Sequence, residues 1–355
     1  MAPLPSPLFA LRSNGMVTVV GNSTAQTTAS WIAQTRRQRR IHLDGFADPF
    51  TIADCNTVTA GLGGVERLSS MLASAVTEAL DNAEHLGPNP QAECLEILLV
   101  PQWLASEGCA QLSAMLSSWI APYPVWSGRS RERMIIQAGA TGAWLALEHA
   151  YRALGQNRRL QHVMIAAVDS ACESAVLRHA ADADWLLRPG NSQGYIPGEA
   201  AACVLLERIR NVTDISTDDF ALHRPALVQA PARLWPGADQ ADASPLCKAL
   251  SGALASSGMG ATNISHLESE MDGSDWRARI ESTALNRVIF TETSALPQWR
   301  PATLLGQVGT AGGVIAWLLP AMLHRQRIDR VNTVLNWSIE PTGEIAACVL
   351  ERSPH

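Results

Sequence analysis

Three side chains of the kinds used in nucleophilic catalysis stand out in the sequence: Cys172, His266 and Glu270. Cys172 lies in the segment Asp-Ser-Ala-Cys-Glu-Ser at residues 169–174, and His266 lies close to Glu270. A cysteine thiolate attacks an acyl thioester when a base or a helix N-terminus favours its ionised form. An enzyme built on these side chains would use Cys172 as its nucleophile and would lose its activity on Cys172→Ala.

The residues around these positions predict alternating strands and helices, which favours a layered α/β architecture. Short, nearly continuous apolar runs are typical of central strands covered on both faces. We expect strands at Leu95–Pro101, Val163–Val168, Arg287–Phe290 and Val331–Trp337, and helices at Gly142–Leu154, Pro245–Ser256, Asp275–Leu285 and Gly312–His324. Pro320 should kink the last helix, because an interior proline costs about 3 kcal/mol.

An internal repeat indicates two related halves. Residues 198–208 read Gly-Glu-Ala-Ala-Ala-Cys-Val-Leu-Leu-Glu-Arg, and residues 343–352 read Gly-Glu-Ile-Ala-Ala-Cys-Val-Leu-Glu-Arg. Such spacing predicts a duplicated α/β unit in which each half ends in a buried strand. We place the halves at residues 1–208 and 209–355 of one compact domain, with the connection in Asn211–Ser244.

Composition narrows the class of protein. The chain has 355 residues, of which 47% are hydrophobic, enough for a large core. A net charge of −6 argues against nucleic-acid binding, and no apolar run reaches the roughly 18 residues of a membrane span. The N-terminus has no signal-peptide pattern, and seven cysteines without a Cys-x-x-Cys pair argue against disulfides or zinc. We therefore expect a cytoplasmic protein without a cofactor or metal.

Several segments together resemble the β-ketoacyl synthase branch of the thiolase-like superfamily. They are Gly15–Thr18, Ala138–Leu154, Val163–Ser170, Gly194–Ala200 and the glycine-rich loop at 306–314. Of these, Gly194–Ala200 is similar to the family's Gly-Phe-x-x-Gly-Glu-Gly. The resemblance is nearly end to end. It implies a thiolase-like fold in which two duplicated α/β halves form a layered αβαβα sandwich.

The resemblance also implies that the catalytic residues have been replaced. The family's nucleophilic cysteine, at a helix N-terminus, aligns with Gly139, and its two histidines align with Glu270 and Gln307. A carboxylate at 270 would repel an anionic substrate, whereas the Gln307 amide still has a hydrogen to donate. The family lysine is Ala302, and the Gly-Phe-Gly-Gly loop is absent from Asn336–Gly343. These groups act as a unit in the family, so their joint loss predicts a non-catalytic protein.

Two alternatives for the missing residues stay open. Cys172 lies in a segment that resembles the one around the family nucleophile, but the family's spacing to the Gly-Glu-Gly glutamate matches the 60 positions from Gly139 to Glu199. Only 27 positions separate Cys172 from Glu199. His266 would become the catalytic histidine if the alignment shifted by a few residues, although the glycine and threonines that should follow are absent.

Two further segments are relevant to which proteins this chain binds. The family forms dimers through the strand before the nucleophile turn, here Glu132–Ala138 with the apolar residues Met134, Ile135 and Ile136, and a homodimer is the natural expectation. The basic run at residues 36–40 would suit an acidic partner or, more simply, a solvated helix end.

Trp144 and Trp317 lie early in the two helices that frame the expected pocket. They would either plug an acyl tunnel or pack in the core.

The opening Gly-Met-Val-Thr-x-Val-Gly, the compact length and the lost triad resemble thiolase-like accessory proteins associated with type VI secretion effectors in Gram-negative bacteria. This resemblance implies an adaptor or chaperone-like role, with a secretion adaptor, an effector or a spike protein as partner. One alternative is an inactive partner subunit of an active ketosynthase, similar to a chain-length factor. Another is an acyltransferase that uses relocated residues.

Overall fold

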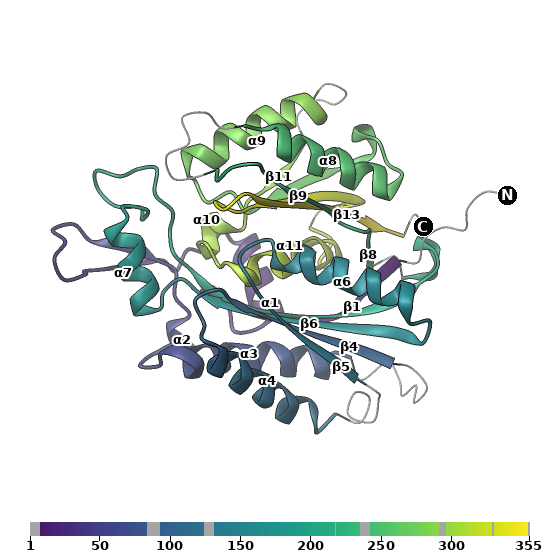
Figure 1. Cartoon of the computed structure of the whole chain (residues 1–355), viewed down its shortest axis with the longest axis horizontal. Coiled ribbons are helices and arrows are strands. Elements are labelled where there is room, and N and C mark those ends of the chain that lie inside the picture. Colours follow the sequence, from purple (N-terminus) through teal and green to yellow (C-terminus); the bar gives the residue numbers. More distant parts are fainter. Residues whose placement is uncertain are drawn as a thin grey trace.

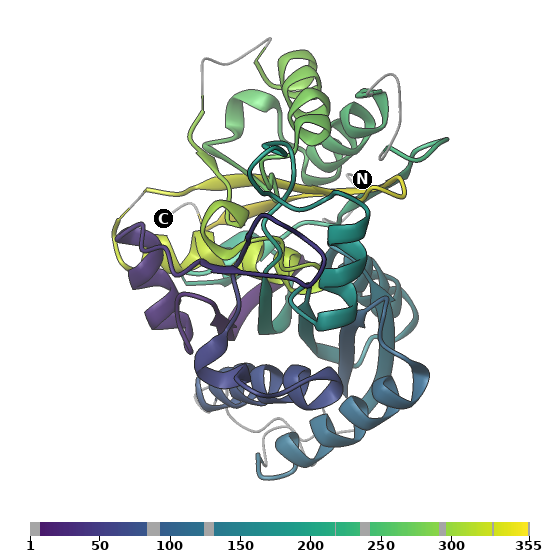
Figure 2. The same ribbon diagram turned by 90° about the vertical axis from the view of Figure 1, so that its left-hand side faces the viewer.

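The computed structural model of this protein describes residues 8–83, 93–123, 131–216, 218–234, 242–290, 296–328 and 330–353. Within them, two sheets enclose a pair of central helices and carry further helices on their outer faces (Figure 1). Figure 2 shows the same stacking after a quarter turn. The layered αβαβα architecture expected from the sequence is confirmed.

The first half builds a sheet with the strand order β5-β4-β6-β7-β1. Strands β4, β5 and β6 are parallel, whereas β7 runs antiparallel to β6 and β1. The bounds are β1 (Leu8–Thr18), β4 (Glu93–Pro101), β5 (Arg131–Ala138), β6 (Leu160–Ser170) and β7 (Glu199–Ile209), with a small ribbon of β2 (Arg39–Ile41) and β3 (Phe50–Ile52). The helices are α1 (Thr24–Ile32), α2 (Asn56–Thr59), α3 (Gly64–Asp81), α4 (Ser106–Ile120), α6 (Gly142–Gln156) and α7 (Ser174–Asp182).

The second half repeats this topology, with the order β11-β10-β12-β13-β9 and the same pattern of parallel and antiparallel neighbours. Its strands are β9 (Ala226–Gln229), β10 (His266–Ser269), β11 (Gln298–Trp299), β12 (Thr333–Ile339) and β13 (Glu344–Arg352). Its helices are α8 (Ser244–Ser257), α9 (Asp275–Val288), α10 (Ala302–Leu305) and α11 (Thr310–Arg325). The repeated Gly-Glu segments lead into β7 and β13, which hold equivalent places.

The connection between the halves is structured. Within Asn211–Ser244 the chain forms a 3₁₀ turn (Val212–Asp214), β8 (Phe220–Leu222) and β9, while residues 217 and 235–241 lie outside the described part. β8 pairs with both β1 and β13 and so joins the two sheets. A division of the chain after residue 208 remains our proposal.

The central strands consist of nearly continuous apolar runs because both of their faces are buried. In β4, Ile97 and Leu99 pack in the cluster that contains the central helices α6 and α11, whereas Leu98 and Val100 pack with α3 and α4. The corresponding outer cluster of the second half contains residues of α8 and α9. Helix α11 is buried along nearly its whole length because it lies between two sheets, and it continues through Pro320 to Arg325.

One predicted strand is wrong. Arg287 and Val288 are the last residues of α9, and Phe290 follows in a turn. The helical spacing of Ile280, Ala284 and Leu285 extends to Val288, so the apolar residues that suggest a strand instead complete the buried face of the helix. The strand of this region is β11, later in the chain.

No helix in the described ranges is long and apolar enough to cross a membrane.

Candidate functional site

A pocket of about 520 Å³ lies where the two central helices begin. Gly139 precedes α6 and Gly309 precedes α11, and both residues line the pocket. Gln307, Arg277 and Glu340 also line it. The structure thus brings together two positions that the sequence assigned to catalysis, Gly139 and Gln307, and two charged residues that the sequence did not point out.

Glu340 occupies the place beside Gly139 where a nucleophile's side chain would project. Its carboxylate accepts a hydrogen bond from the backbone N–H of Thr141 over 3.1 Å, at the N-terminus of α6. A Cβ atom on Gly139 would lie 2.3 Å from Glu340 Oε1. The positive end of the α6 dipole is therefore already matched by a carboxylate of the protein itself.

Asp169 does the same for α11. Its carboxylate accepts from the backbone N–H of Thr310 over 3.0 Å, and a Cβ atom on Gly309, whose φ is +51°, would lie 2.0 Å from Asp169 Oδ2. Asp169 belongs to β6, and Glu340 directly follows the equivalent strand β12. Each half of the chain thus caps the central helix of the other half.

Arg277, in the first turn of α9, holds the other loops of the pocket together. Its guanidinium is 3% exposed and pairs with Asp272 over 2.8 Å. It also donates to the backbone carbonyls of Glu270 (3.2 Å) and Ile339 (3.0 Å). The side-chain oxygen of Gln307, in the amide orientation that satisfies it, accepts from Arg277 over 3.1 and 3.2 Å. One arginine therefore contacts both positions assigned to the family histidines.

Glu270 is a buried acid whose state differs from our expectation. Burial raises the pKa of Glu270 to about 8, against the lowering effects of the Ser338 hydroxyl, which donates to it over 2.5 Å, and of Arg277. The raised pKa favours the neutral, protonated form of Glu270, in contrast to the repulsive carboxylate expected from the sequence. Glu270 is not among the lining residues of the pocket.

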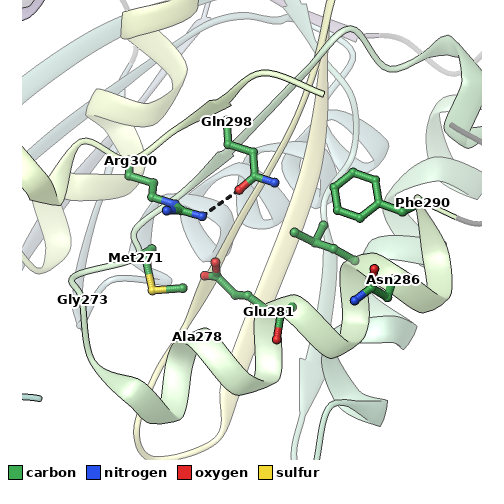
Figure 3. Close-up of a pocket in the computed structure, with 10 residues that line it drawn as sticks. Met271, Gly273, Ala278, Glu281, Asn286, Phe290, Gln298 and Arg300 are labelled. Atoms are coloured by element: carbon green, nitrogen blue, oxygen red, sulfur yellow. Dashed lines mark hydrogen bonds between the residues drawn. The ribbon is translucent and has the colours of Figure 1, made fainter. Parts of the chain in front are cut away.

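Glu281 lies one turn after Arg277, on the floor of a separate hollow of about 370 Å³ beside α9 (Figure 3). Met271, Leu285 and Arg300 are among the residues around it. Ser269 donates to the Glu281 carboxyl over 3.1 Å, and burial raises the pKa of Glu281 to about 7. The second half therefore holds three acids with raised pKa values, Glu270, Glu281 and Glu340, close to the same arginine.

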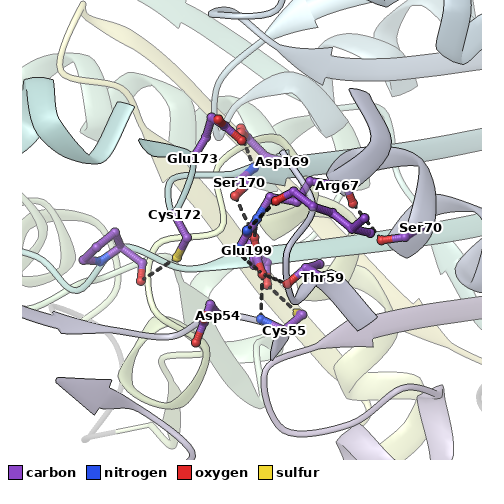
Figure 4. A network of polar contacts seen from close by, with 12 residues as sticks. Asp54, Cys55, Thr59, Arg67, Ser70, Asp169, Ser170, Cys172, Glu173 and Glu199 are labelled. Atoms are coloured by element: carbon purple, nitrogen blue, oxygen red, sulfur yellow. Dashed lines mark hydrogen bonds and ion pairs between the residues drawn. The ribbon is translucent and has the colours of Figure 1, made fainter. Parts of the chain in front are cut away.

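Cys172 lies in a different network, shown in Figure 4. Its thiol is buried, with Sγ 3.6 Å from the carbonyl oxygen of Pro197. Burial, and after it the charge of Glu199, raise the pKa of Cys172 well above that of a free thiol. A thiol in this setting is a poor nucleophile because its ionised form is disfavoured.

Glu199 is the centre of that network. Its buried carboxylate accepts from Arg67 Nε (2.6 Å), from the hydroxyls of Thr59 (2.8 Å) and Ser170 (2.7 Å), and from the backbone N–H of Cys55 (2.7 Å). These bonds tie the Gly-Glu turn before β7 to α2, α3 and β6. The role of Glu199 here is to position chain segments.

His266 is the first residue of β10 and lies apart from the pocket residues described above. Its ring stacks on Trp299 with centroids 4.7 Å apart, and its Nδ1 lies 2.9 Å from Ser265 Oγ. His266 is not among the residues that line the pocket.

Trp144 and Trp317 are fully buried against each other between α6 and α11, with ring centroids 6.1 Å apart. The indole N–H of Trp144 donates to Asn336 over 3.1 Å. This is a core contact between the two halves. It fills the space beyond the nucleophile turn, and the idea that it plugs a former tunnel stays a prediction.

The structure also locates two surface segments discussed above, the strand β5 and the basic run at residues 36–40. β5 is the last strand of its sheet, so its outer edge has no neighbour among the described strands. On it, Ile135 is 39% exposed, while Met134 and Ile136 are half-buried. In the basic run, Arg39 pairs with Asp54 over 2.5 Å, whereas Arg36 and its neighbours are largely solvent-exposed.

Among the described residues, no group of three or more histidine, cysteine, aspartate or glutamate side chains is arranged to hold a metal ion.

Comparison with protein-family models and with curated proteins gives no match. Solved structures do match over nearly the whole chain. The ketosynthase from module 6 of the bacillaene synthase of Bacillus subtilis 168 superposes with a TM-score of 0.75 at 14% identity, over 97% of this chain and 72% of that one. A ketosynthase in complex with its chain length factor from Xenorhabdus doucetiae gives 0.74 at 13% identity, over 98% of both chains.

A third structure, of a type II polyketide synthase acyl-carrier protein in complex with its ketosynthase, gives a TM-score of 0.79 at 12% identity, over 98% of this chain and 100% of that one. The chain therefore has the thiolase-like fold found in ketosynthases.

We predict that Gly139→Cys does not create a reactive nucleophile and destabilises the fold by about 1–3 kcal/mol, because the new Cβ meets the Glu340 carboxylate. Urea unfolding and the rate of iodoacetamide labelling measure the two effects. Combining it with Glu340→Ala removes the collision and should recover part of the lost stability. Gly155→Cys is the matched control, since a Cβ there meets only open space. A Gly139→Cys protein as stable as wild type would contradict the prediction.

Glu270 also predicts a pH dependence of stability. A carboxyl whose folded pKa is raised contributes stability that is fully present below its unfolded pKa and is lost as the pH rises to about 8. Because the amide cannot titrate, Glu270→Gln should make the decline in unfolding free energy between pH 5 and 8 shallower by about 1.4 kcal/mol per pH unit. Chemical denaturation across this range is the measurement, with Glu132→Gln, on the exposed edge of β5, as control. Equal slopes for Glu270→Gln and wild type would show that Glu270 is ionised in the folded protein.

Proposed function

We propose that this protein is a catalytically inactive relative of the ketosynthases that functions by binding other proteins. The observation that carries the proposal is the Glu340 carboxylate at the N-terminus of α6, hydrogen-bonded to Thr141 and in contact range of any side chain at position 139. An acyl thioester needs that helix end for its carbonyl and needs a nucleophile at position 139. Here the helix end is satisfied and the nucleophile is glycine.

The remaining candidates for chemistry support the same conclusion. The side-chain oxygen of Gln307 accepts from Arg277. The Glu270 carboxyl accepts from Ser338 and is not among the residues that line the pocket, so it is not placed there as a proton donor. Cys172 and His266 lie outside the pocket lining and in separate parts of the fold. No pair of nucleophile and base results from this arrangement.

This proposal predicts an absence of turnover. Malonyl and acetyl thioesters, free or on a carrier protein, should be neither condensed nor decarboxylated above the uncatalysed rate, and Cys172→Ala should give the same progress curve as wild type. Liquid chromatography with mass spectrometry of the thioesters is the measurement. An active ketosynthase assayed in parallel shows that the conditions permit turnover. Activity abolished by Cys172→Ala would instead establish an acyltransferase with a relocated nucleophile.

The partner we propose is a component of type VI secretion, either an adaptor or an effector that this protein loads or stabilises in an accessory, chaperone-like role. This choice rests on the resemblance of the N-terminal segment and the lost triad to thiolase-like accessory proteins. The edge of β5 supports a binding role, because an edge strand offers unpaired backbone groups to a partner strand. The same edge would form the homodimer expected from the sequence.

A second candidate is an inactive subunit paired with an active ketosynthase. The similarity over 98% of both chains to a ketosynthase in complex with its chain length factor favours it. This alternative also uses β5, but it requires a catalytic ketosynthase as partner. The two proposals therefore differ in which protein is bound and share the surface that binds it.

We predict that Ile135→Asp weakens partner binding at least tenfold and leaves the fold intact, because Ile135 is 39% exposed on the unpaired edge of β5. Affinity purification of the tagged protein from its native host, followed by mass spectrometry and by light scattering of the purified complex, is the measurement. Ile328→Asp is the matched control, since Ile328 is also an exposed isoleucine, at 55%, and follows α11.

The proteins recovered decide between the proposals. Secretion adaptors, spike proteins or toxins retained by wild type and lost by Ile135→Asp support the accessory role. An active ketosynthase or an acyl carrier protein, lost in the same variant, supports the inactive-subunit role instead. Equal recovery by Ile135→Asp and Ile328→Asp would exclude β5 as the binding surface.

A further inference from the structure

A second pocket lies at the opposite end of α6 from Glu340. It has a volume of about 370 Å³ and is lined in part by the last turn of α6, at Leu154 and Gly155. Its other walls come from both halves of the chain, because Arg208 is near the end of β7 and Arg224 follows β8. Arg158, in the turn between α6 and β6, completes a set of three arginines.

These arginines are poorly neutralised. Arg208 donates to the backbone carbonyl of Arg158 over 2.9 Å, and no described carboxylate pairs with either side chain. Arg224 pairs with Glu148 over 2.6 Å, but Glu148 is shared with Arg152 over 2.9 Å. Two guanidinium groups without a carboxylate partner on one hollow leave a local positive charge that an anion can neutralise. This cluster of three arginines is unusual because the chain as a whole carries a net charge of −6.

The floor of the pocket is apolar. Leu8, Leu154 and the ring of Tyr151 line it. The Tyr151 hydroxyl donates to the backbone carbonyl of Leu222 over 2.6 Å, so its hydrogen is already used within the protein. A bare inorganic anion would leave this apolar surface uncovered, and the volume lies within the range of pockets that enclose small organic ligands.

We propose that this pocket binds a small organic phosphate monoester, with the phosphate on Arg158 and Arg208 and the organic group over Tyr151 and Leu154. Guanidinium groups bind phosphate oxygens through paired, charge-assisted hydrogen bonds. A dianionic phosphate monoester matches two unpaired arginines in charge. The site is independent of the pocket at Gly139 and of the partner proposed for β5.

The experiment uses phenyl phosphate as the probe and titration calorimetry on the full chain at low salt. We expect binding that weakens as salt is added, because the contact is electrostatic and partly exposed. Arg158→Gln combined with Arg208→Gln should weaken it at least tenfold. Inorganic phosphate and benzyl alcohol, which carry only one part of the ligand each, should both bind at least tenfold less tightly than phenyl phosphate.

Gly155 provides a matched pair of variants, since a Cβ at this position meets nothing within 4 Å and glycine there is inside a helix. Gly155→Glu should abolish binding, whereas Gly155→Gln, of nearly the same size, should retain more of it. Thermal unfolding checks that both fold. Absence of phenyl phosphate binding, or binding insensitive to the arginine pair and to the Gly155→Glu charge, would overturn the proposal. A phosphoserine peptide that binds more tightly than phenyl phosphate would also overturn it, in favour of a protein ligand.

Discussion

Two buried helix N-termini that meet at one pocket each need an acceptor for their free N–H groups, and the rest of this fold depends on how that need is met. In this chain the acceptors are carboxylates exchanged between the halves. Asp169 of the first half caps α11, and Glu340 of the second half caps α6. The duplicated topology makes the exchange possible, because equivalent strands end at equivalent places. The same exchange places the Glu340 and Asp169 carboxylates where a side chain at position 139 or 309 would lie.

Charge links the residues that surround this pocket. Asp272 belongs to the loop after β10, Glu340 follows β12, and both acids lie near the buried guanidinium of Arg277. Loss of one partner of such a buried pair typically costs about 3–5 kcal/mol, since it leaves an uncompensated charge. Gln307 fits this set as a neutral acceptor of the arginine's remaining hydrogens. A protonated histidine there would place a second cation against Arg277, whereas the Gln307 amide accepts from the arginine without adding charge.

The sequence predicted the layers well and the content of the pocket poorly, for different physical reasons. Apolar runs such as Leu95–Pro101 and the repeated Gly-Glu strands report burial directly, and the structure follows them. Arg287–Phe290 was misassigned because a short apolar run fits a strand and a helix end equally well. Glu340 and Thr141 meet across 199 positions, and Arg277 is one arginine in a helix with other charges. Only the absence of the Gly-Phe-Gly-Gly loop hinted that something else occupies that place.

The pocket at Gly139 and the proposed binding surface are connected through the end of β5. The carbonyl of Ala138, the last residue of that strand, accepts from the Thr310 hydroxyl over 2.6 Å, and Thr310 is itself held by Asp169. Near its start, Arg133 pairs with the buried Glu96 of β4. An edge strand fixed at both ends loses little conformational entropy when a partner strand adds to it. The interactions that satisfy the two helix N-termini at the pocket therefore also stiffen the edge on which we propose that a partner binds, so that the pocket and the proposed binding surface are structurally coupled.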